Sequence, residues 1–167
     1  MRPQSSRVSA GEVWGGSRGL DSCSLFVSEA APKLRRAFAA RFGLGIADDV
    51  TAEAVAYAWN HWDRVASMAN PVGFLFTVGC SKARKYRRWG RRIAFPVESV
   101  RPIESRRDLF DGLRRLSDDQ RVAVVAVHGY GWTYAEVAEI LGVSTTAVTN
   151  HVHRGLAKLR VLLQERP

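Results

Sequence analysis

The chain has 167 residues, of which 46% are hydrophobic, and it carries a formal net charge of +9. This hydrophobic content excludes a disordered tail and is enough for one domain of ordinary size or two small ones. The excess of positive charge points to an anionic partner, of which nucleic acid is the commonest. The sequence holds no apolar run of membrane-spanning length and no apolar segment typical of a secretory signal, so we expect a cytoplasmic protein without a membrane partner.

The first part of the chain predicts a leader followed by helices. Residues 1–20 are rich in Ser, Gly and Arg without a hydrophobic period, which is typical of a flexible leader. From about residue 24 to residue 42, apolar side chains recur at helical intervals, and Pro32 is expected to kink or restart that helix. The helix should end at the glycine-containing break over residues 43–45.

A second helix is expected from this break to about Arg64. Asp48 and Asp49 are expected in its first turn, where the helix dipole favours negative charge. The helix also has a broad apolar and aromatic face, formed by Val55, Ala58, Trp59 and Trp62.

A third helix is expected to start at Asn70 and Pro71, because Asn can accept an orphan amide proton and Pro loses nothing at the first helical position. It ends in KARKYRRWGRR, residues 82–92, which holds seven basic residues, two aromatic residues and no acid. Cations along the phosphates, with rings on which unpaired bases stack, are typical of single-stranded nucleic acid binding. The alternative is that Tyr86 and Trp89 belong to the core and that the cations only keep the surface soluble.

Residues 93–107 lack a sustained period and contain two prolines, so we interpret them as a linker between domains at 21–92 and 108–167. A helix is expected over residues 108–116, and Ser117 with Gln120 predicts a capping box before the next helix. The apolar run that follows could be a buried strand by composition. The cap before it and the glycines after it favour a helix.

The pattern of the last segment is that of a helix-turn-helix. Thr133 and Glu136 predict a second capping box, Gly142 should end that helix in the left-handed conformation, and Ser144 should cap the next one. In the final helix, one side is apolar, with Val148, Val152, Leu156 and Leu159. The other side carries hydrogen-bonding and cationic groups suited to a DNA major groove: Thr145, Thr146, Thr149, Asn150, His153, Arg154 and Lys158.

The polar, histidine and acidic residues also allow interpretations other than DNA binding. A merely solvated helix face is usually rich in Glu and Lys rather than in Thr, Asn and His, which are poorer helix formers. His151 and His153 point in nearly opposite directions on a helix, which disfavours a zinc site. Asp48, Asp49 and Glu53 could form a carboxylate cluster for acid–base or Mg²⁺ chemistry, although a helix start attracts acids anyway. We therefore expect a protein that is not an enzyme and needs no cofactor or metal.

Two segments of the chain resemble a known family. DDVTAEAVAYAWNHWDRV, with NPVGFLFTVGCSKARKYRR after it, is similar to region 2 of sigma-70-type initiation factors of the extracytoplasmic-function (ECF) group. LRRLSDDQRVAVVAVHGYGWTYAEVAEILGVSTTAVTNHVHRGLAKLRVLL resembles their region 4. The two matches come in the family's order with a linker between them. The resemblance implies an all-α fold of two small domains, a region 2 helical bundle and a region 4 helix-turn-helix.

The resemblance also implies a function. Such factors bind core RNA polymerase and direct promoter recognition, promoter melting and transcription initiation, and an anti-sigma factor is a further partner that the resemblance allows. The implied polymerase contacts are Asp48, Asp49, Glu53 and Trp59. The residues implied to bind the melted minus-ten strand are Asn70, Ser81, Arg84, Lys85, Tyr86, Arg87, Arg88 and Trp89. The helix that starts at Thr145 would bind the minus-thirty-five duplex.

The sequence departs from the family pattern at several of these positions. Many relatives carry Gln where Ala52 aligns, and Asn followed by Asp where Ser81 and Lys85 align; the usual basic residues near Thr149 and His151 are absent. We therefore expect a minus-ten preference that differs from the commonest one. The competing hypothesis is a stand-alone helix-turn-helix transcriptional regulator that does not bind polymerase. A third is a nuclease or nucleotide-modifying enzyme that uses the acids of the second helix.

Overall fold

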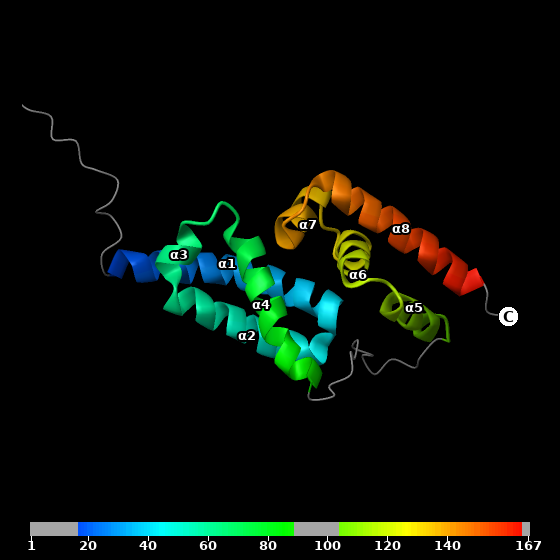
Figure 1. The fold of residues 1–167 in the computed structure, drawn as a ribbon, viewed down its shortest axis with the longest axis horizontal. Coiled ribbons are helices and arrows are strands. Elements are labelled where there is room, and N and C mark those ends of the chain that lie inside the picture. The colour runs from blue at the N-terminus through cyan, green and yellow to red at the C-terminus, as the bar shows by residue number, and fades with distance from the viewer. Residues whose placement is uncertain (1–16, 89–103, 165–167) are drawn as a thin grey trace, which may run out of the picture.

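The structure is a computed structural model that describes residues 17–88 and 104–164, and every regular element within these ranges is a helix. The N-terminal half contains four helices: α1 (Ser17–Phe42), α2 (Leu44–Asn60), α3 (Trp62–Ala66) and α4 (Pro71–Arg88). α2 folds back along α1 after a break at Gly43, and α4 packs on both (Figure 1).

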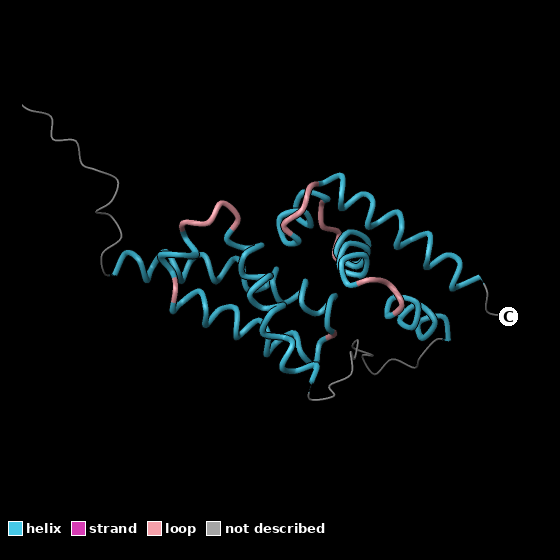
Figure 2. The backbone as a smooth tube through the Cα atoms, viewed as in Figure 1, coloured by secondary structure: helices cyan, strands magenta, loops and turns pink. Residues whose placement is uncertain are grey.

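The C-terminal half contains α5 (Glu104–Arg114), α6 (Asp118–Val124) with a π-helical turn η1 (Val125–Gly129), α7 (Tyr134–Leu141) and α8 (Thr145–Gln164). α8 is the long helix of this half and packs against α5, α6 and α7. The short loops that separate α6, α7 and α8 are visible as pink segments in Figure 2. None of the helices in the described ranges is long and apolar enough to cross a membrane.

Side-chain caps define the starts of α6 and α4. Ser117 Oγ accepts a hydrogen bond from Gln120 N at 3.4 Å, and the Gln120 side chain accepts one from Ser117 N, which completes the expected capping box. This cap makes the following apolar segment helical rather than a strand, as expected. Asn70 Oδ1 likewise accepts from Gly73 N at 2.8 Å, which confirms the predicted start of α4.

One hydrophobic core joins the two halves. Phe38 and Val50 from the N-terminal half belong to the same buried cluster as Ala126, Trp132 and Val148 from the C-terminal half. A smaller cluster of Leu113, Leu116, Val124 and Leu159 holds α5 to α6 and α8. The two halves therefore pack against each other in one body, with α7 on α4 and α6 on α1.

Several predicted helix boundaries were wrong. α1 begins at Ser17 rather than near residue 24 and continues through Pro32 as one helix, because Ala30 and Leu34 on both sides of the proline are buried in the core. α2 begins at Leu44, so Asp48 and Asp49 follow its first turn instead of lying within it.

The remaining boundary differences concern the ends of α2 and α5. α2 ends at Asn60, and the expected continuation to Arg64 is the separate helix α3. α5 begins at Glu104, inside the segment that we interpreted as linker. Most of that linker, and residues 1–16 of the expected leader, lie outside the described residues.

Candidate nucleic-acid interface

The helix-turn-helix is built as the local sequence predicts. Thr133 Oγ1 accepts from Glu136 N at 3.2 Å and the Glu136 carboxylate accepts from Thr133 N at 2.9 Å, so the second capping box is present. α7 ends at Gly142, whose φ of 66° is the left-handed conformation that glycine adopts most easily. Ser144 Oγ then accepts from Ala147 N at 3.1 Å and starts α8.

The polar face of α8 is open to solvent. The buried residues of this helix are Val148, Val152, Gly155 and Leu159. Leu156, which we expected on the apolar face, is 36% exposed, and Gly155 takes the buried position because it lies against Val124 and Gln120 of α6. All seven side chains predicted to meet duplex DNA are exposed, namely those of Thr145, Thr146, Thr149, Asn150, His153, Arg154 and Lys158.

Two of these side chains already make hydrogen bonds within the protein. Thr149 Oγ1 donates to the main-chain oxygen of Thr145 at 3.0 Å, a bond within the helix that leaves its methyl group exposed. Lys158 Nζ donates to the main-chain oxygen of Arg115 at 2.7 Å, so this cation also ties α8 to the end of α5. Lys158 is therefore a structural contact as well as a candidate phosphate contact.

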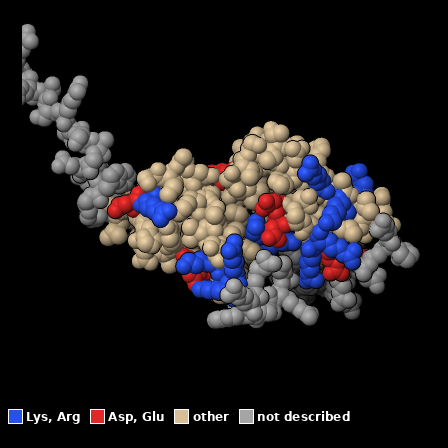
Figure 3. Space-filling view, viewed as in Figure 1, with Lys and Arg blue, Asp and Glu red and all other residues tan. Residues whose placement is uncertain are grey.

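The basic strip, residues 81–88 at the C-terminal end of α4, is the second cationic surface. On the face drawn in Figure 3, Lys and Arg side chains gather near this end of α4 and over the half of the molecule that holds α5, α6 and α8. Ser81, Arg84 and Lys85 are exposed, and Arg87 and Arg88 lie in the last turn of the helix. Trp89 lies outside the described residues.

Tyr86 belongs partly to the core, as the alternative interpretation of the strip proposed. Its ring is partly buried against the hydrophobic cluster, and its hydroxyl donates to Glu53 Oε1 at 3.3 Å. The ammonium of Lys85 lies 4.9 Å from the centre of the Tyr86 ring.

Glu53 joins α2 to the basic strip. Its carboxylate forms an ion pair with Lys85 and accepts the Tyr86 hydroxyl. The hydrogen bond from Lys85 lowers the pKa of the Glu53 carboxyl below its ordinary value, and the same bond raises the pKa of the Lys85 ammonium. Glu53 therefore positions the strip, a role that the sequence pattern did not indicate.

The other residues expected to contact polymerase lie along α2. Asp48 is exposed and pairs with Arg35, with Nε donating to Oδ1 at 2.5 Å. Asp49 is partly buried on the next position of the helix. Trp59 is 42% exposed near the C-terminal end of α2, which makes it one of the large apolar side chains that the fold leaves at the surface.

Asn70, expected to help capture the melted strand, faces the C-terminal half of the protein. Its Oδ1 caps α4, and its Nδ2 donates to the main-chain oxygen of Glu139 in α7 at 2.7 Å. The structure therefore brings Asn70 together with the first helix of the helix-turn-helix.

The chain is similar to known sigma factors. Residues 106–159 match the family model described as Sigma-70, region 4. The chain is 35% identical over 107 residues to the RNA polymerase sigma factor CarQ of Myxococcus xanthus, an alignment that covers 56% of this chain and 61% of CarQ. It is 28% identical over 133 residues to the ECF RNA polymerase sigma factor SigL of Mycobacterium tuberculosis, which covers 71% of this chain and 75% of SigL. The chain thus spans about three fifths of the length of CarQ.

The C-terminal part of the chain is thus similar to sigma-70 region 4, and the longer alignment is with an ECF sigma factor. The fold of the chain is also similar to two solved sigma factors. The sigma factor RpoE from Bartonella quintana, in complex with the anti-sigma factor NepR, matches with a TM-score of 0.57 and 24% identity over 88% of this chain and 99% of that one. CnrH, in complex with the cytosolic domain of CnrY, matches with a TM-score of 0.53 and 25% identity over 92% of each chain.

The sigma-70 region 4 match begins within α5 and ends within α8, so it includes α7, the turn and most of α8. The alignment with SigL is longer than this match, so the likeness to ECF sigma factors extends beyond region 4.

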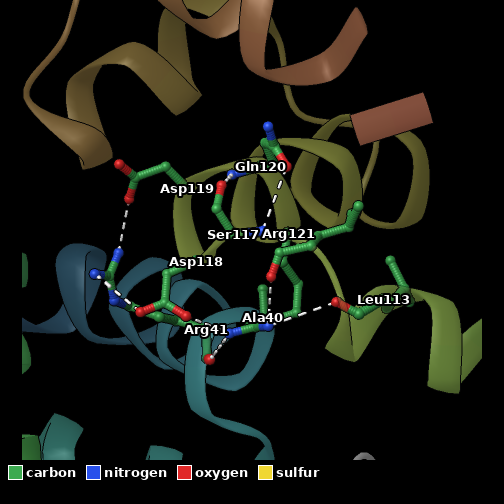
Figure 4. Close-up of polar contacts among 9 residues, drawn as sticks. Ala40, Arg41, Leu113, Ser117, Asp118, Asp119, Gln120 and Arg121 are labelled. Carbon is green, nitrogen blue, oxygen red and sulfur yellow. Dashed lines mark hydrogen bonds and ion pairs between the residues drawn. The ribbon is translucent and has the colours of Figure 1, made fainter. Parts of the chain in front are cut away.

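The sequence pattern did not indicate the structural role of one residue within the region 4 match, Arg121. Arg121 is 2% exposed, and its guanidinium donates to the main-chain oxygens of Ala40 at 3.1 Å and Arg41 at 2.7 Å, at the C-terminal end of α1 (Figure 4). Asp118 accepts from the same guanidinium at 2.6 Å. An arginine directly before an apolar run, with an acid three positions before it, is a signal that could have indicated a buried, paired cation.

Proposed function

We propose that this ECF-type chain is a sigma factor, which binds core RNA polymerase and directs it to promoters. Residues 21–92 would form the region 2 domain, and residues 108–167 would form the region 4 domain. The observation that carries the proposal is the open polar face of α8, where the seven side chains proposed to contact bases or phosphates lie exposed on a helix whose other side is buried.

α8 has the chemistry to bind the minus-thirty-five duplex. Asn150 can form a bidentate pair with adenine, and the Thr side chains can bond to base edges while their methyl groups contact thymine. Arg154 and Lys158 lie further along the helix, where cations bind phosphates in helix-turn-helix proteins. Few cations lie near the start of α8, so hydrogen bonds to bases carry much of this recognition.

The basic strip has the chemistry to bind the melted minus-ten strand. Arg84 and Lys85 are exposed and can follow the phosphates, with Ser81 beside them. Tyr86, partly buried against the core, is the described aromatic residue of this proposed site, and stacking of a base on an aromatic ring contributes about 1 to 3 kcal/mol, which would offset part of the unpairing cost. Asn70, Arg87, Arg88 and Trp89 are the further residues of this proposed site.

The polymerase would dock on α2. Trp59 supplies an exposed aromatic anchor, of the kind that dominates many interfaces, and Asp48, Asp49 and Glu53 supply negative charge along the same helix. Because RpoE and CnrH are both solved with a partner, RpoE with an anti-sigma factor, we also propose an anti-sigma partner for this chain. The chain would act in the cytoplasm without catalysis or cofactor.

In vitro transcription with purified core polymerase tests this function. Adding the chain to core and a library of promoter sequences should produce transcripts from a defined subset, and that subset should share an upstream and a minus-ten element. The competing hypothesis, a stand-alone regulator, predicts that the chain binds duplex DNA but does not co-purify with core polymerase. Duplex binding without transcription or co-purification would therefore reject the sigma-factor proposal.

A further inference from the structure

The ammonium group of Lys85 is held in place by α2. It donates to Oε1 of Glu53, and the same carboxylate oxygen accepts the hydroxyl of Tyr86 at 3.3 Å. The ammonium also lies 4.9 Å from the centre of the Tyr86 ring. These contacts fix the position of a long side chain that would otherwise sample many rotamers.

The Glu53 carboxylate also balances the charge of Lys85. The hydrogen bond from Lys85 keeps the pKa of Glu53 below its ordinary value, so Glu53 is ionised at neutral pH. A lysine that neutralises a DNA phosphate releases counterions, which drives binding. Lys85 already has an anionic partner, so a phosphate contact would exchange one anion for another and leave Glu53 unpaired beside the DNA backbone. Such a contact would therefore add little net affinity.

Arg84, the neighbouring cation of the basic strip, differs from Lys85 in this respect. Successive side chains of a helix point about 100° apart, and Arg84 lines a pocket with Arg41 and Asp118. Within residues 17–88 and 104–164, no acid forms an ion pair with Arg84. Arg84 therefore keeps its full charge for a phosphate.

A fixed ammonium group with a balanced charge is suited to discriminate between bases. A lysine ammonium has three N–H donors and no acceptor. Glu53 engages the Lys85 ammonium on the α2 side, while 48% of the Lys85 side chain remains exposed to solvent. A donor at this position favours guanine, which presents O6 and N7, or thymine, which presents O4, over the amino groups of adenine and cytosine.

We propose that Glu53 makes Lys85 a specificity-determining residue of the minus-ten site, where the ammonium donates to a guanine or thymine of the melted strand instead of binding a phosphate. The proposal rests on the sigma-factor function proposed above. Glu53 acts through Lys85 and is a positioning residue. Arg84 remains the phosphate contact beside it.

Holoenzyme assembled from the full chain and purified core polymerase tests the proposal. It is bound to promoter DNA whose minus-ten strand is unpaired and randomised in sequence. Two quantities are measured, the base preference at each position of the strand and the slope of log affinity against log salt concentration. The first reports contacts to bases, and the second reports contacts to phosphates.

Lys85→Met removes the ammonium but keeps an apolar stem beside the Tyr86 ring. The preference for guanine or thymine should fall about fivefold at one position, and the salt slope should stay as in wild type. Arg84→Ala should show the opposite pattern, with a salt slope less steep by about 0.7 and an unchanged base preference.

Glu53→Gln keeps an oxygen that can accept the Tyr86 hydroxyl and removes the negative charge. Lys85 then has a free charge for a phosphate, so the salt slope should become steeper by about 0.7 and the base preference should weaken. Asp48→Asn is the matched control, because it removes another carboxylate of α2 whose partner is Arg35. It should change neither the slope nor the preference.

Exchange of the two charges separates base discrimination from a structural role. Glu53→Lys combined with Lys85→Glu restores an ion pair between α2 and α4 but presents acceptors to the strand. The preference at the same position should then move to adenine or cytosine, whose amino groups donate. Circular dichroism checks that the double variant is folded, and the single variants decide the question if it is not.

Two results would overturn the proposal while leaving the sigma-factor function intact. In one, Lys85→Met makes the salt slope less steep by about 0.7 and keeps every base preference, which shows an ordinary phosphate contact. In the other, Glu53→Gln changes neither the slope nor the preference. If wild type forms no holoenzyme, or its holoenzyme selects no minus-ten sequence, the proposed function itself is wrong.

Discussion

The guanidinium of Arg121 lies against the end of α1, with Nη2 donating to the main-chain oxygen of Arg41 at 2.7 Å. The side chain is buried, and it reaches this carbonyl from the other domain. Arg121 thus supplies the C-terminal cap of a helix that begins more than a hundred residues earlier in the chain. This relationship makes the stability of the N-terminal half depend on the C-terminal half.

Replacing Arg121 should therefore destabilise the whole chain. Arg121→Met keeps much of the side-chain volume but leaves the Ala40 and Arg41 carbonyls without a donor and Asp118 without its cation. A buried acceptor left without its donor typically costs about 1 to 3 kcal/mol. We expect a loss of this size in the free energy of unfolding, measured by urea denaturation. Arg160→Met, at an exposed position on α8, should change it by less than about 0.5 kcal/mol, and equal losses would contradict the capping role.

Asn150 should determine one base of the upstream element. Its side chain is exposed on the second turn of α8, where helix-turn-helix proteins contact base edges. Asn150→Ala should lose about 1 to 3 kcal/mol of binding free energy for the best upstream sequence and relax the preference at one position. Binding of holoenzyme to a library of duplexes measures both effects.

Arg154→Ala is the matched control for Asn150→Ala. Arg154 is exposed one turn further along the same helix, and a phosphate contact there would weaken binding to all sequences alike. If Asn150→Ala also weakened all sequences equally, Asn150 would not contact a base.

The helix-turn-helix could be predicted almost completely, because its signals are local. Each cap joins residues three positions apart, as in the pairs Ser117 with Gln120 and Thr133 with Glu136, and the glycine that ends α7 follows directly in the sequence. The exposed face of α8 follows from helical periodicity alone. These features therefore require no knowledge of the rest of the fold.

The contacts between the domains could not be predicted in this way. Asn70 and Glu139 are 69 positions apart, and Arg121 reaches a carbonyl 80 positions before it, so no local pattern connects them. Tertiary packing also decided the length of α1, where burial on both sides of Pro32 kept the helix continuous despite the lost hydrogen bond. The sequence indicated that Asn70 caps α4, but not that its amide faces a second helix.

Arg84 should contribute to DNA binding mainly through its charge. It is exposed within the basic strip, which we propose binds the phosphates of the melted strand. Arg84→Ala should weaken promoter binding by holoenzyme and reduce the steepness of its salt dependence by about 0.7 in a log–log plot, the value for one single-strand phosphate contact. Arg114→Ala removes an exposed cation on α5 and should leave the slope of the salt dependence unchanged. The same slope in both variants would show that Arg84 does not contact a phosphate.

The Glu53–Lys85 ion pair should make stability depend on pH. The pKa of Glu53 is lowered in the folded protein by Lys85, so its contribution is fully present above the ordinary carboxyl pKa of about 4.3 and is lost as pH falls through the lower, folded pKa. Wild type should therefore be more stable than Glu53→Gln at neutral pH, and the difference should shrink in acid. Urea denaturation across pH 3 to 7 measures it.

The partner variant is the control for this pH dependence. Lys85→Met removes the cation that lowers the Glu53 pKa. The free energy of unfolding of this variant should therefore depend less on pH in acid than that of wild type. If the free energy of unfolding of wild type and of Lys85→Met depended on pH in the same way below about pH 4.3, the ion pair would not be the cause of that dependence.

Trp59 should be an anchor for core polymerase. It is 42% exposed on α2 and outside the buried core, so its removal should change the free energy of unfolding by less than about 0.5 kcal/mol. Buried aromatic anchors at interfaces contribute about 2 kcal/mol or more, so Trp59→Ala should weaken core binding by at least about thirtyfold. Tyr134→Ala removes a similarly exposed aromatic side chain from α7, 37% exposed, and should bind core as wild type does. If both variants bind core like wild type while remaining folded, α2 does not dock the polymerase through Trp59.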